Sequence, residues 1–409
     1  GADSPSGNEQ KEDGMGVVPA KVSTSSHAKR GKVEREGDTI IATGLTVKET
    51  IEALVRIEEQ DNLVVAVNYQ FADLFFTEAL FAFMAALKER HGDFFASPVP
   101  GMFGPTPPTM LGIETGPGQV TQAIWGGFEL PGFKGQFQTQ LGWSNGSPIL
   151  TLTGKMRQKD QPELNAIIED TKRIAKEQSI YRGKALELRF PDPEDIPNPL
   201  DHAPKFMQFG AQEEPVFNAE IQAIIDNYIY EDIEATALTK LNNMPIKKGI
   251  MLEGPPGVGK TLLAHTLARK CVENGWTFCY IKDVGELSQA VALVRNRWEP
   301  VMVFAEDLDR VVGKERTDAV NEVLNVIDGV DSKSNDIVIL VTTNEIEGIH
   351  KTMLRPGRLD VLISVTAPDA RTVQQLIRRE AGSTLDVEED LGEVGRELEG
   401  TMPAVVVQV

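Results

Sequence analysis

Hydrophobic and polar residues follow a helical spacing in some parts of the N-terminal half and a strand-like alternation in others. The first helical segment is VKETIEALVRIEEQ, and Thr46 with Glu49 forms a capping box at its start. NLVVAVNYQF then predicts a strand, and ADLFFTEALFAFMAALKERHG predicts a long, largely buried helix. This part of the chain is therefore expected to mix helices and strands.

A series of strand-like runs follows the long helix. After a loop rich in proline and glycine at 97–108, these runs are separated by glycine-containing turns: TMLGIET, QVTQAIWG, GQFQTQLGW and PILTLTGKM. A helix over about 161–178 and a strand, KALELRF, complete the unit. The pattern predicts an α+β domain with a mostly antiparallel sheet, and it indicates no particular family.

Large aromatic residues in these runs leave two interpretations open. Trp125, Phe128 and Trp143 would indicate a partner surface if their rings were exposed. We favour packing in the core, because large aromatic side chains bury much apolar area.

Composition marks the domain boundaries. Residues 1–36 combine glycine, serine and charge with almost no large apolar side chains, so they predict a disordered tail. Residues 191–215 are dense in proline and acid and predict an extended linker. The α+β domain thus spans 37–190. Beyond the linker, a helix over 217–241 precedes alternating strands and helices, as in a parallel doubly wound sheet.

The charge and the cysteines limit the partners and the compartment. The chain has 61 acidic and 41 basic residues and a formal net charge of -20, which disfavours nucleic acid as a partner. The two cysteines, Cys271 and Cys279, give no disulfide framework and no metal-ligand spacing, so a reducing cytoplasm fits best. The most apolar stretch, at 79–87, is too short to cross a bilayer, and we expect no membrane partner.

The strongest chemical motif is a phosphate-binding loop, GPPGVGKT, between an apolar strand and an apolar helix. Its glycines let backbone N–H groups converge on phosphates, Lys260 neutralises charge, and the Thr261 hydroxyl is a ligand for magnesium. The motif alone leaves kinases, GTPases and many ATPases open. The nucleotide-binding residues that it predicts are Gly254, Pro255, Pro256, Gly257, Val258, Gly259, Lys260, Thr261 and Leu262.

Two later strands end in polar residues. VMVFAEDLD ends in Glu306 and Asp307, where carboxylates that order magnesium and polarise water are needed. VILVTTNEIEGIHKTMLRPGRLD reaches Asn344, which is suited to orienting the attacking water, and continues to Arg355 and Arg358. On their own, two arginines near a phosphate site are ambiguous.

Together these segments resemble the AAA family of ring-forming ATPases over about 220–409. GPPGVGKT resembles its Walker A, FAEDLD its Walker B, TTN its sensor 1 and LRPGRLD its arginine-finger segment. The resemblance implies an α/β P-loop AAA+ module with a large subdomain over 216–366 and a helical lid over 367–409, which looks incomplete. It also implies a ring, commonly a hexamer, that binds ATP and Mg2+ and receives Arg355 and Arg358 from the neighbouring subunit.

The acidic pair departs from the usual Asp-Glu order of the family. Counting from Pro300 places Glu306 at the magnesium position, with Thr261, and Asp307 at the position of the base. A similar Glu-Asp order occurs in the AAA branch of the mitochondrial Rieske-protein translocase. The exchange moves a carboxylate by about one methylene, a displacement that matters for catalysis, so which acid polarises water stays open.

A second departure concerns how a substrate is handled. FCYIKDVGELSQAVALVRNRW runs almost directly into the Walker B strand and contains no aromatic-apolar-glycine pore motif. We therefore expect an ATP-hydrolysing ring that remodels, translocates or disassembles an unidentified protein held by the N-terminal domain, without aromatic threading. The alternative is a nucleotide-dependent switch or assembly scaffold with slow turnover. A nucleic-acid motor is disfavoured by the acidity and by the lack of a basic, aromatic strip.

Overall fold

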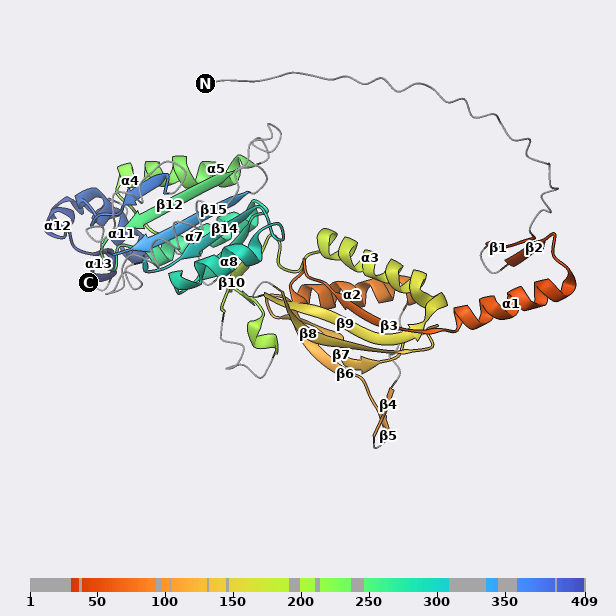
Figure 1. The fold of residues 1–409 in the computed structure, drawn as a ribbon. Helices are drawn as coiled ribbons and strands as arrows, with labels where there is room; N and C mark the ends of the chain where they lie inside the picture. Colours follow the sequence, from red (N-terminus) through yellow and green to blue (C-terminus); the bar gives the residue numbers. More distant parts are fainter. Residues whose placement is uncertain are drawn as a thin grey trace, which may run out of the picture. The chain divides into compact units, whose positions relative to one another are not determined.

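A computed structural model gives the fold of the chain (Figure 1). The residues that it describes are 31–36, 39–92, 98–102, 104–130, 132–144, 147–190, 199–209, 214–236, 246–308, 336–344, 359–386 and 388–407. The chain divides into two compact units, Gly1–Leu63 and Val64–Val409. Among the described residues, no helix has both the length and the apolar character that crossing a membrane requires.

The first unit contains a two-stranded ribbon and one helix. Strands β1 (Lys32–Glu36) and β2 (Thr39–Thr43) pair antiparallel, and helix α1 spans Val47–Asp61. The predicted capping box is confirmed, because the Glu49 amide donates to Thr46 Oγ1 at 3.3 Å and the Thr46 amide donates to the Glu49 carboxylate at 2.8 Å. Strand β1 takes the place of the end of the predicted tail, and residues 1–30 lie outside the described residues.

The second unit begins with the predicted α+β region. Its five-stranded sheet is antiparallel throughout, in the order β3-β9-β8-β7-β6. Helix α2 (Phe76–His91) is largely buried, as its sequence predicts, and packs with helix α3 (Gln161–Glu177) and the sheet in one apolar core. The strands are β3 (Val64–Gln70), β6 (Thr109–Gly116), β7 (Gln119–Phe128), β8 (Gln136–Ser144) and β9 (Ser147–Arg157).

The three aromatic residues singled out in these strands have different environments. Phe128 is fully buried and Trp125 packs, partly buried, against the core, whereas Trp143 is 42% exposed. Core packing is thus confirmed for two of the three rings. The segment expected as a loop at 97–108 instead contains a short antiparallel ribbon of β4 (Val99–Gly101) and β5 (Gly104–Thr106).

The C-terminal region of the second unit is built on a mostly parallel sheet in the order β11-β10-β13-β14-β15-β12-β16. Only β11 runs antiparallel to its neighbour among these strands. The predicted doubly wound parallel sheet is therefore confirmed. The strands are β10 (Ala185–Glu187), β11 (Lys205–Phe206), β12 (Lys247–Glu253), β13 (Thr277–Ile281), β14 (Val301–Ala305), β15 (Ile337–Thr343) and β16 (Val361–Ser364).

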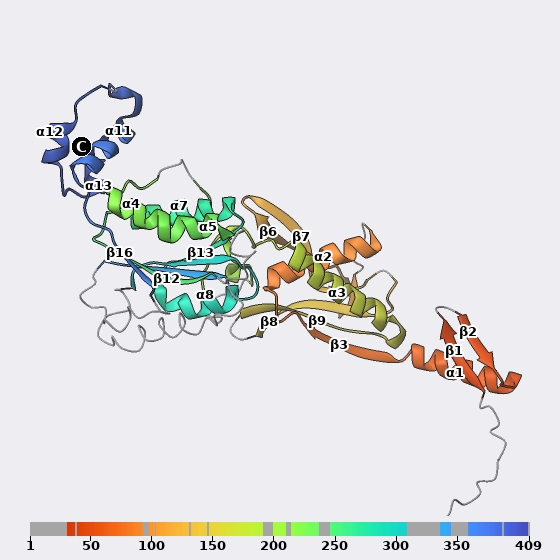
Figure 2. The same ribbon diagram turned by 90° about the horizontal axis from the view of Figure 1, so that it is seen from above.

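Alternate residues of the strands enter cores on the two faces of this sheet. In β12, Ile250 and Leu252 join the core formed with α7 (Lys260–Glu273), whereas Met251 joins the core that includes α8 (Leu287–Val294). Figure 2 shows α7 on one face of the sheet and α8 on the other. Both faces are covered, which explains why the strands read as continuous apolar runs.

The β11–β10 edge of the sheet is formed by residues that the sequence pattern assigned to the N-terminal domain and to the linker. Strand β10 was expected to close the N-terminal domain, but it pairs in parallel with β13. Strand β11 lies within the predicted linker and pairs antiparallel with β10, and a short 3-10 helix at Pro199–His202 precedes it. Leu186 is fully buried, so β10 gains burial from joining this sheet.

The helices around the sheet are more broken than their sequence pattern suggests. The segment predicted as a helix at 217–241 forms α4 (Ala219–Ile225), a π-helical turn (Asp226–Tyr230) and α5 (Glu231–Glu234), and its last residues lie outside the described part. The lid region is helical as predicted. Its elements are α11 (Ala370–Ala381), a 3-10 turn (Gly382–Thr384), α12 (Gly392–Glu397) and α13 (Pro403–Val406).

The core of the α+β region makes a direct prediction about stability. Phe83 of α2 is fully buried, and its ring centroid lies 6.3 Å from that of Phe128. Phe83→Ala is expected to lower the free energy of unfolding by about 3–5 kcal/mol, because it removes apolar contacts and leaves a cavity. Val64→Ala, at a position 64% exposed on β3, is the control and should change it by less than about 0.5 kcal/mol. Equal effects in chemical denaturation would contradict this packing.

Candidate functional site

The carboxyl ends of three parallel strands meet at one edge of the C-terminal sheet. Glu253 at the end of β12 pairs with Thr343 of β15, and Ala305 at the end of β14 pairs with Val341. The phosphate loop therefore follows β12 where the acidic pair follows β14 and Asn344 follows β15. In open α/β sheets this edge is where ligands bind.

The loop needs glycine at two of its positions. A Cβ on Gly254 would lie 2.3 Å from the carbonyl oxygen of Val365, so no larger residue fits without moving backbone. Gly259 caps α7 with a φ of 100°, in the region that favours glycine. The first turn of α7 thus starts directly from the loop, and its backbone N–H groups and helix dipole favour an anion.

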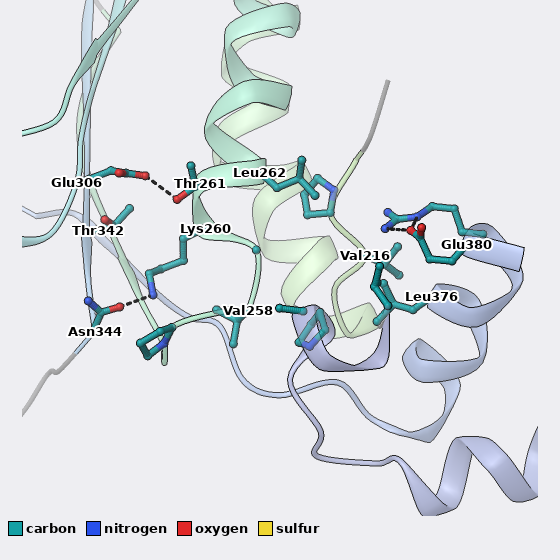
Figure 3. A pocket seen from close by; sticks show the side chains of 18 of the residues that line it. Val216, Val258, Lys260, Thr261, Leu262, Glu306, Thr342, Asn344, Leu376 and Glu380 are labelled. Carbon is teal, nitrogen blue, oxygen red and sulfur yellow. Dashed lines mark hydrogen bonds and ion pairs between the residues drawn. The ribbon is translucent and has the colours of Figure 1, made fainter. Parts of the chain in front are cut away.

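Lys260 organises the loop. Its side chain is buried, with the residue only 8% exposed. Its Nζ donates to the carbonyl oxygens of Gly254 at 2.5 Å and Pro255 at 3.2 Å, and to Oδ1 of Asn344 at 2.9 Å. Figure 3 shows the Lys260–Asn344 bond. These hydrogen bonds hold the ammonium at the loop, where the lysine of a phosphate loop reaches a bound phosphate.

The two acids occupy different positions beside the loop. Thr261 Oγ1 donates to Glu306 Oε1 at 2.6 Å (Figure 3), which brings a hydroxyl and a carboxylate oxygen together as magnesium requires. Asp307 instead accepts a hydrogen bond from Asn344 Nδ2 at 3.3 Å, and its own amide donates to Thr342 Oγ1 at 3.1 Å. Asp307 has a φ of 54°, a left-handed conformation that is uncommon outside glycine.

Two residues near the acids were not singled out from the sequence. Thr342 lies in the predicted TTN segment, and its hydroxyl fixes the backbone at Asp307. Tyr280 of β13 stacks on Phe304 at a centroid distance of 6.0 Å, and burial together with the neighbouring Glu306 carboxylate raises the pKa of its phenol. An aromatic residue in a buried strand is ordinarily a core residue, so no sequence pattern marks Tyr280 as part of a site.

A cavity of about 690 Å3 extends from the loop to the lid helices. Its polar end holds Lys260, Thr261, Glu306, Asp307 and Asn344. Its other end is mostly apolar and is bounded by the segment before α4, by α11 and by α13. The apolar residues of that end are Pro215, Val216, Leu376, Pro403, Ala404 and Val407.

Two charged residues of α11, Arg379 and Glu380, line the cavity beside its apolar end. Arg379 Nη2 donates to Glu380 Oε1 at 2.8 Å, and Arg379 Nη1 donates to the carbonyl oxygen of Glu214. Figure 3 shows Glu380 near Val216 and Leu376. Lid and core are thus linked by a hydrogen bond at the apolar end of the cavity.

The side chains fit a nucleoside triphosphate with magnesium. The volume lies within the usual range for small-molecule sites, and one end offers a cation, a hydroxyl and carboxylates while the other offers an apolar wall for a base. All the residues predicted from the phosphate loop are described, and those from Pro256 to Leu262 line the cavity. Arg355 and Arg358 lie outside the described residues.

A strand, a glycine loop and a helix, with a buried lysine and an acid on a neighbouring strand, define a P-loop nucleotide-binding protein. Residues 250–367 match the family model described as "ATPase family associated with various cellular activities (AAA)". The chain therefore carries an AAA ATPase domain, and the resemblance read from its motifs is confirmed. The likeness of its Glu-Asp order to one branch of the family stays a prediction.

Curated relatives support this assignment. A "Proteasome-associated ATPase" of Mycobacterium sp. is 33% identical over an alignment of 197 residues that covers 40% of this chain and 32% of that protein. A "Putative cell division cycle ATPase" of Plasmodium falciparum is 30% identical over 201 residues, 44% of this chain and 16% of that protein. An "AAA ATPase forming ring-shaped complexes" of Bifidobacterium dentium is 32% identical over 157 residues, 32% of this chain and 30% of that protein. The chain thus spans at most about a third of these relatives.

The close approach at Gly254 gives a test of the loop. Gly254→Ala is expected to weaken ATP binding at least about tenfold, equivalent to about 1.4 kcal/mol, because the added Cβ displaces the start of the loop from β16. Gly275→Ala is the control at the other end of α7, where φ is positive at 75° and no atom lies within 4 Å of the added Cβ. It should cost some stability and leave affinity unchanged. Equal affinities for both variants in equilibrium titration would argue against the constraint.

Proposed function

We propose that the chain binds ATP with Mg2+ and hydrolyses it as a subunit of an oligomeric ring that remodels a protein partner. One observation carries this proposal most directly. The buried Lys260, the Thr261–Glu306 pair and the Asn344–Asp307 pair converge at the polar end of a single cavity. That arrangement combines a phosphate-binding group with groups suited to magnesium and to water.

Binding is assigned to the loop and its neighbours. The backbone of residues 254–261 and Lys260 would hold the phosphates, and Thr261 with Glu306 would hold the metal ion, which neutralises developing charge when bound. The apolar end of the cavity, with Val216 and Leu376, would receive the base. Because that end is closed by lid residues, a lid movement would change access to the nucleotide.

Water activation is assigned to Asp307 and Asn344. Asn344 receives a hydrogen bond from Lys260 and donates one to Asp307, so one amide links the phosphate-binding cation to an acid. Glu306 is already engaged by Thr261, which supports giving Glu306 the metal and Asp307 the water. Arg355 and Arg358 would stabilise the developing charge from the neighbouring subunit.

The ring, the compartment and the protein partner are proposed from the names of relatives and from one local feature of the fold. One relative is named for ring-shaped complexes, and others are named proteasome-associated ATPases. After β13 the chain turns at once, because Asp283 Oδ1 accepts a hydrogen bond from the Gly285 amide at 2.8 Å ahead of α8. That compact turn supports remodelling without aromatic threading. We propose a cytoplasmic protein that holds its protein partner through the N-terminal region.

Removal of the loop cation tests nucleotide binding. Lys260→Ala should weaken ATP binding by roughly 100-fold or more, since hydrogen bonds to charged groups contribute about 1.5–3 kcal/mol each. Lys270→Ala, near the other end of α7, is the control, because Lys270 pairs with Glu234 outside the cavity and should not affect affinity. If Lys260→Ala binds a fluorescent ATP analogue with unchanged affinity, the loop is not the phosphate-binding site.

Mixing two inactive variants tests hydrolysis between subunits. Asp307→Asn and Arg355→Ala should each bind ATP and lose roughly 100-fold or more in turnover, because the first removes a base and the second a charge-stabilising donor. A mixture should regain activity, because an intact acid of one subunit meets an intact arginine of the next. The rate is to be measured against protein concentration, with light scattering for mass. No recovery in assembled mixtures would reject the trans role, and assembly with negligible wild-type turnover would favour the switch or scaffold.

A further inference from the structure

A buried carboxylate lies where the α+β region meets the ATPase sheet. Glu78 of α2 is only 2% exposed. Its carboxylate accepts hydrogen bonds from the Ser179 hydroxyl and, at 3.3 Å, from Nε1 of Trp298 in the ATPase region. Burial raises the pKa of Glu78. A buried acid is costly unless it is paired, so these bonds constrain both sides of the junction.

An arginine ties the same two regions through backbone oxygens. Arg297 Nε donates to the Asp73 carbonyl at 3.0 Å, and its Nη2 donates to the Ala72 carbonyl at 3.1 Å. Its Nη1 donates to Leu293 at the end of α8 at 2.9 Å. Arg182 in turn donates to the Arg297 carbonyl at 3.0 Å. One guanidinium therefore joins the turn before α2 to the end of α8.

Aromatic rings fill the space around these polar groups. Trp298 is fully buried, with its ring 5.0 Å from Tyr181 and 6.5 Å from Phe75. The Tyr181 hydroxyl lies 2.6 Å from that of Thr77 on α2. Phe75, Tyr181 and Trp298 belong to one continuous apolar core shared by the α+β region and the ATPase sheet. Densely packed cores of this kind resist continuous deformation.

The junction is connected to the strands that end at the nucleotide site. The Trp298 carbonyl accepts a hydrogen bond from Thr277 Oγ1 at 2.6 Å, and Thr277 begins β13. Val301, three residues after Trp298, begins β14, which ends next to Glu306. The junction thus lies at the amino ends of β13 and β14. Strand β14, which pairs with β13, ends one residue before Glu306 of the cavity, one five-residue strand or about 16 Å away.

We propose that Glu78, Arg297 and Trp298 couple the nucleotide state of the ATPase site to the α+β region of residues 64–181. This rests on the proposed nucleotide binding. Displacement of β13 and β14 when nucleotide engages Glu306 is delivered to the start of α2, because the junction is packed and hydrogen-bonded on both sides. The α+β region therefore responds to nucleotide directly through the core.

Hydrogen exchange on the full chain tests the coupling, with a non-hydrolysable ATP analogue and Mg2+ as the probe. In the wild type, the probe should slow amide exchange at the start of α7 and also in α2 by about fivefold or more, the lower end of usual coupling strengths. Slowing in α7 with no change in α2 would overturn the coupling while nucleotide binding stands. No slowing in either helix would remove the proposed nucleotide binding and the coupling with it.

Matched tryptophan variants test the role of the junction. Trp298→Phe removes the bond to Glu78 and should abolish the nucleotide response of α2 while that of α7 persists. Trp276→Phe is the control, since Trp276 is equally buried and donates to Thr236 at 2.6 Å in the core on the other face of the sheet. It should keep both responses. If Trp298→Phe does not fold, Arg297→Met takes its place. A wild-type response of α2 in the junction variant would overturn the assignment.

Discussion

The burial of one lysine ammonium sets the shape of the nucleotide site. An unpaired charge in a nearly dry position would cost several kcal/mol, so the chain must bring acceptors to Lys260. It does so with two carbonyl oxygens of the loop and with Asn344 from another strand. These bonds curl the loop around the cation and fix it against the end of β15. The parallel register of β12, β14 and β15 then places the acidic pair beside it.

The chemistry of the site was largely predictable from the sequence, because each motif is local. A strand, a glycine loop and a lysine stand within about a dozen residues, and parallel strands necessarily end at one edge of a sheet. The apolar end of the cavity was not predictable. Val216, Leu376 and Ala404 are far apart in the chain and are ordinary apolar residues, so only the tertiary fold brings them together. Tyr280 was missed for the same reason.

The fold was predictable where the apolar pattern continues over a long stretch of the chain. It was not predictable where the helices or strands are short. The antiparallel sheet of the α+β region follows from sustained alternation, and the buried helix α2 from its length. Strand β10 has only three residues, so its sequence does not say which sheet it joins. Strand β11 lies in a segment rich in proline and acid, and the β4–β5 ribbon lies in one rich in proline and glycine. Both compositions predict loops, although short strands form there.

The inverted acidic pair is consistent with the geometry that surrounds it. Glu306 directly follows the extended β14, and its longer side chain reaches Thr261 across the start of α7. Asp307 has a shorter side chain, and its backbone adopts a left-handed conformation that costs on the order of 1 kcal/mol. Two hydrogen bonds hold it there, one donated by its own amide to the Thr342 hydroxyl and one that its carboxylate accepts from Asn344. Strain that is stabilised by polar neighbours in a cavity is typical of functional positions, which supports a catalytic part for Asp307 despite the exchange of the two acids.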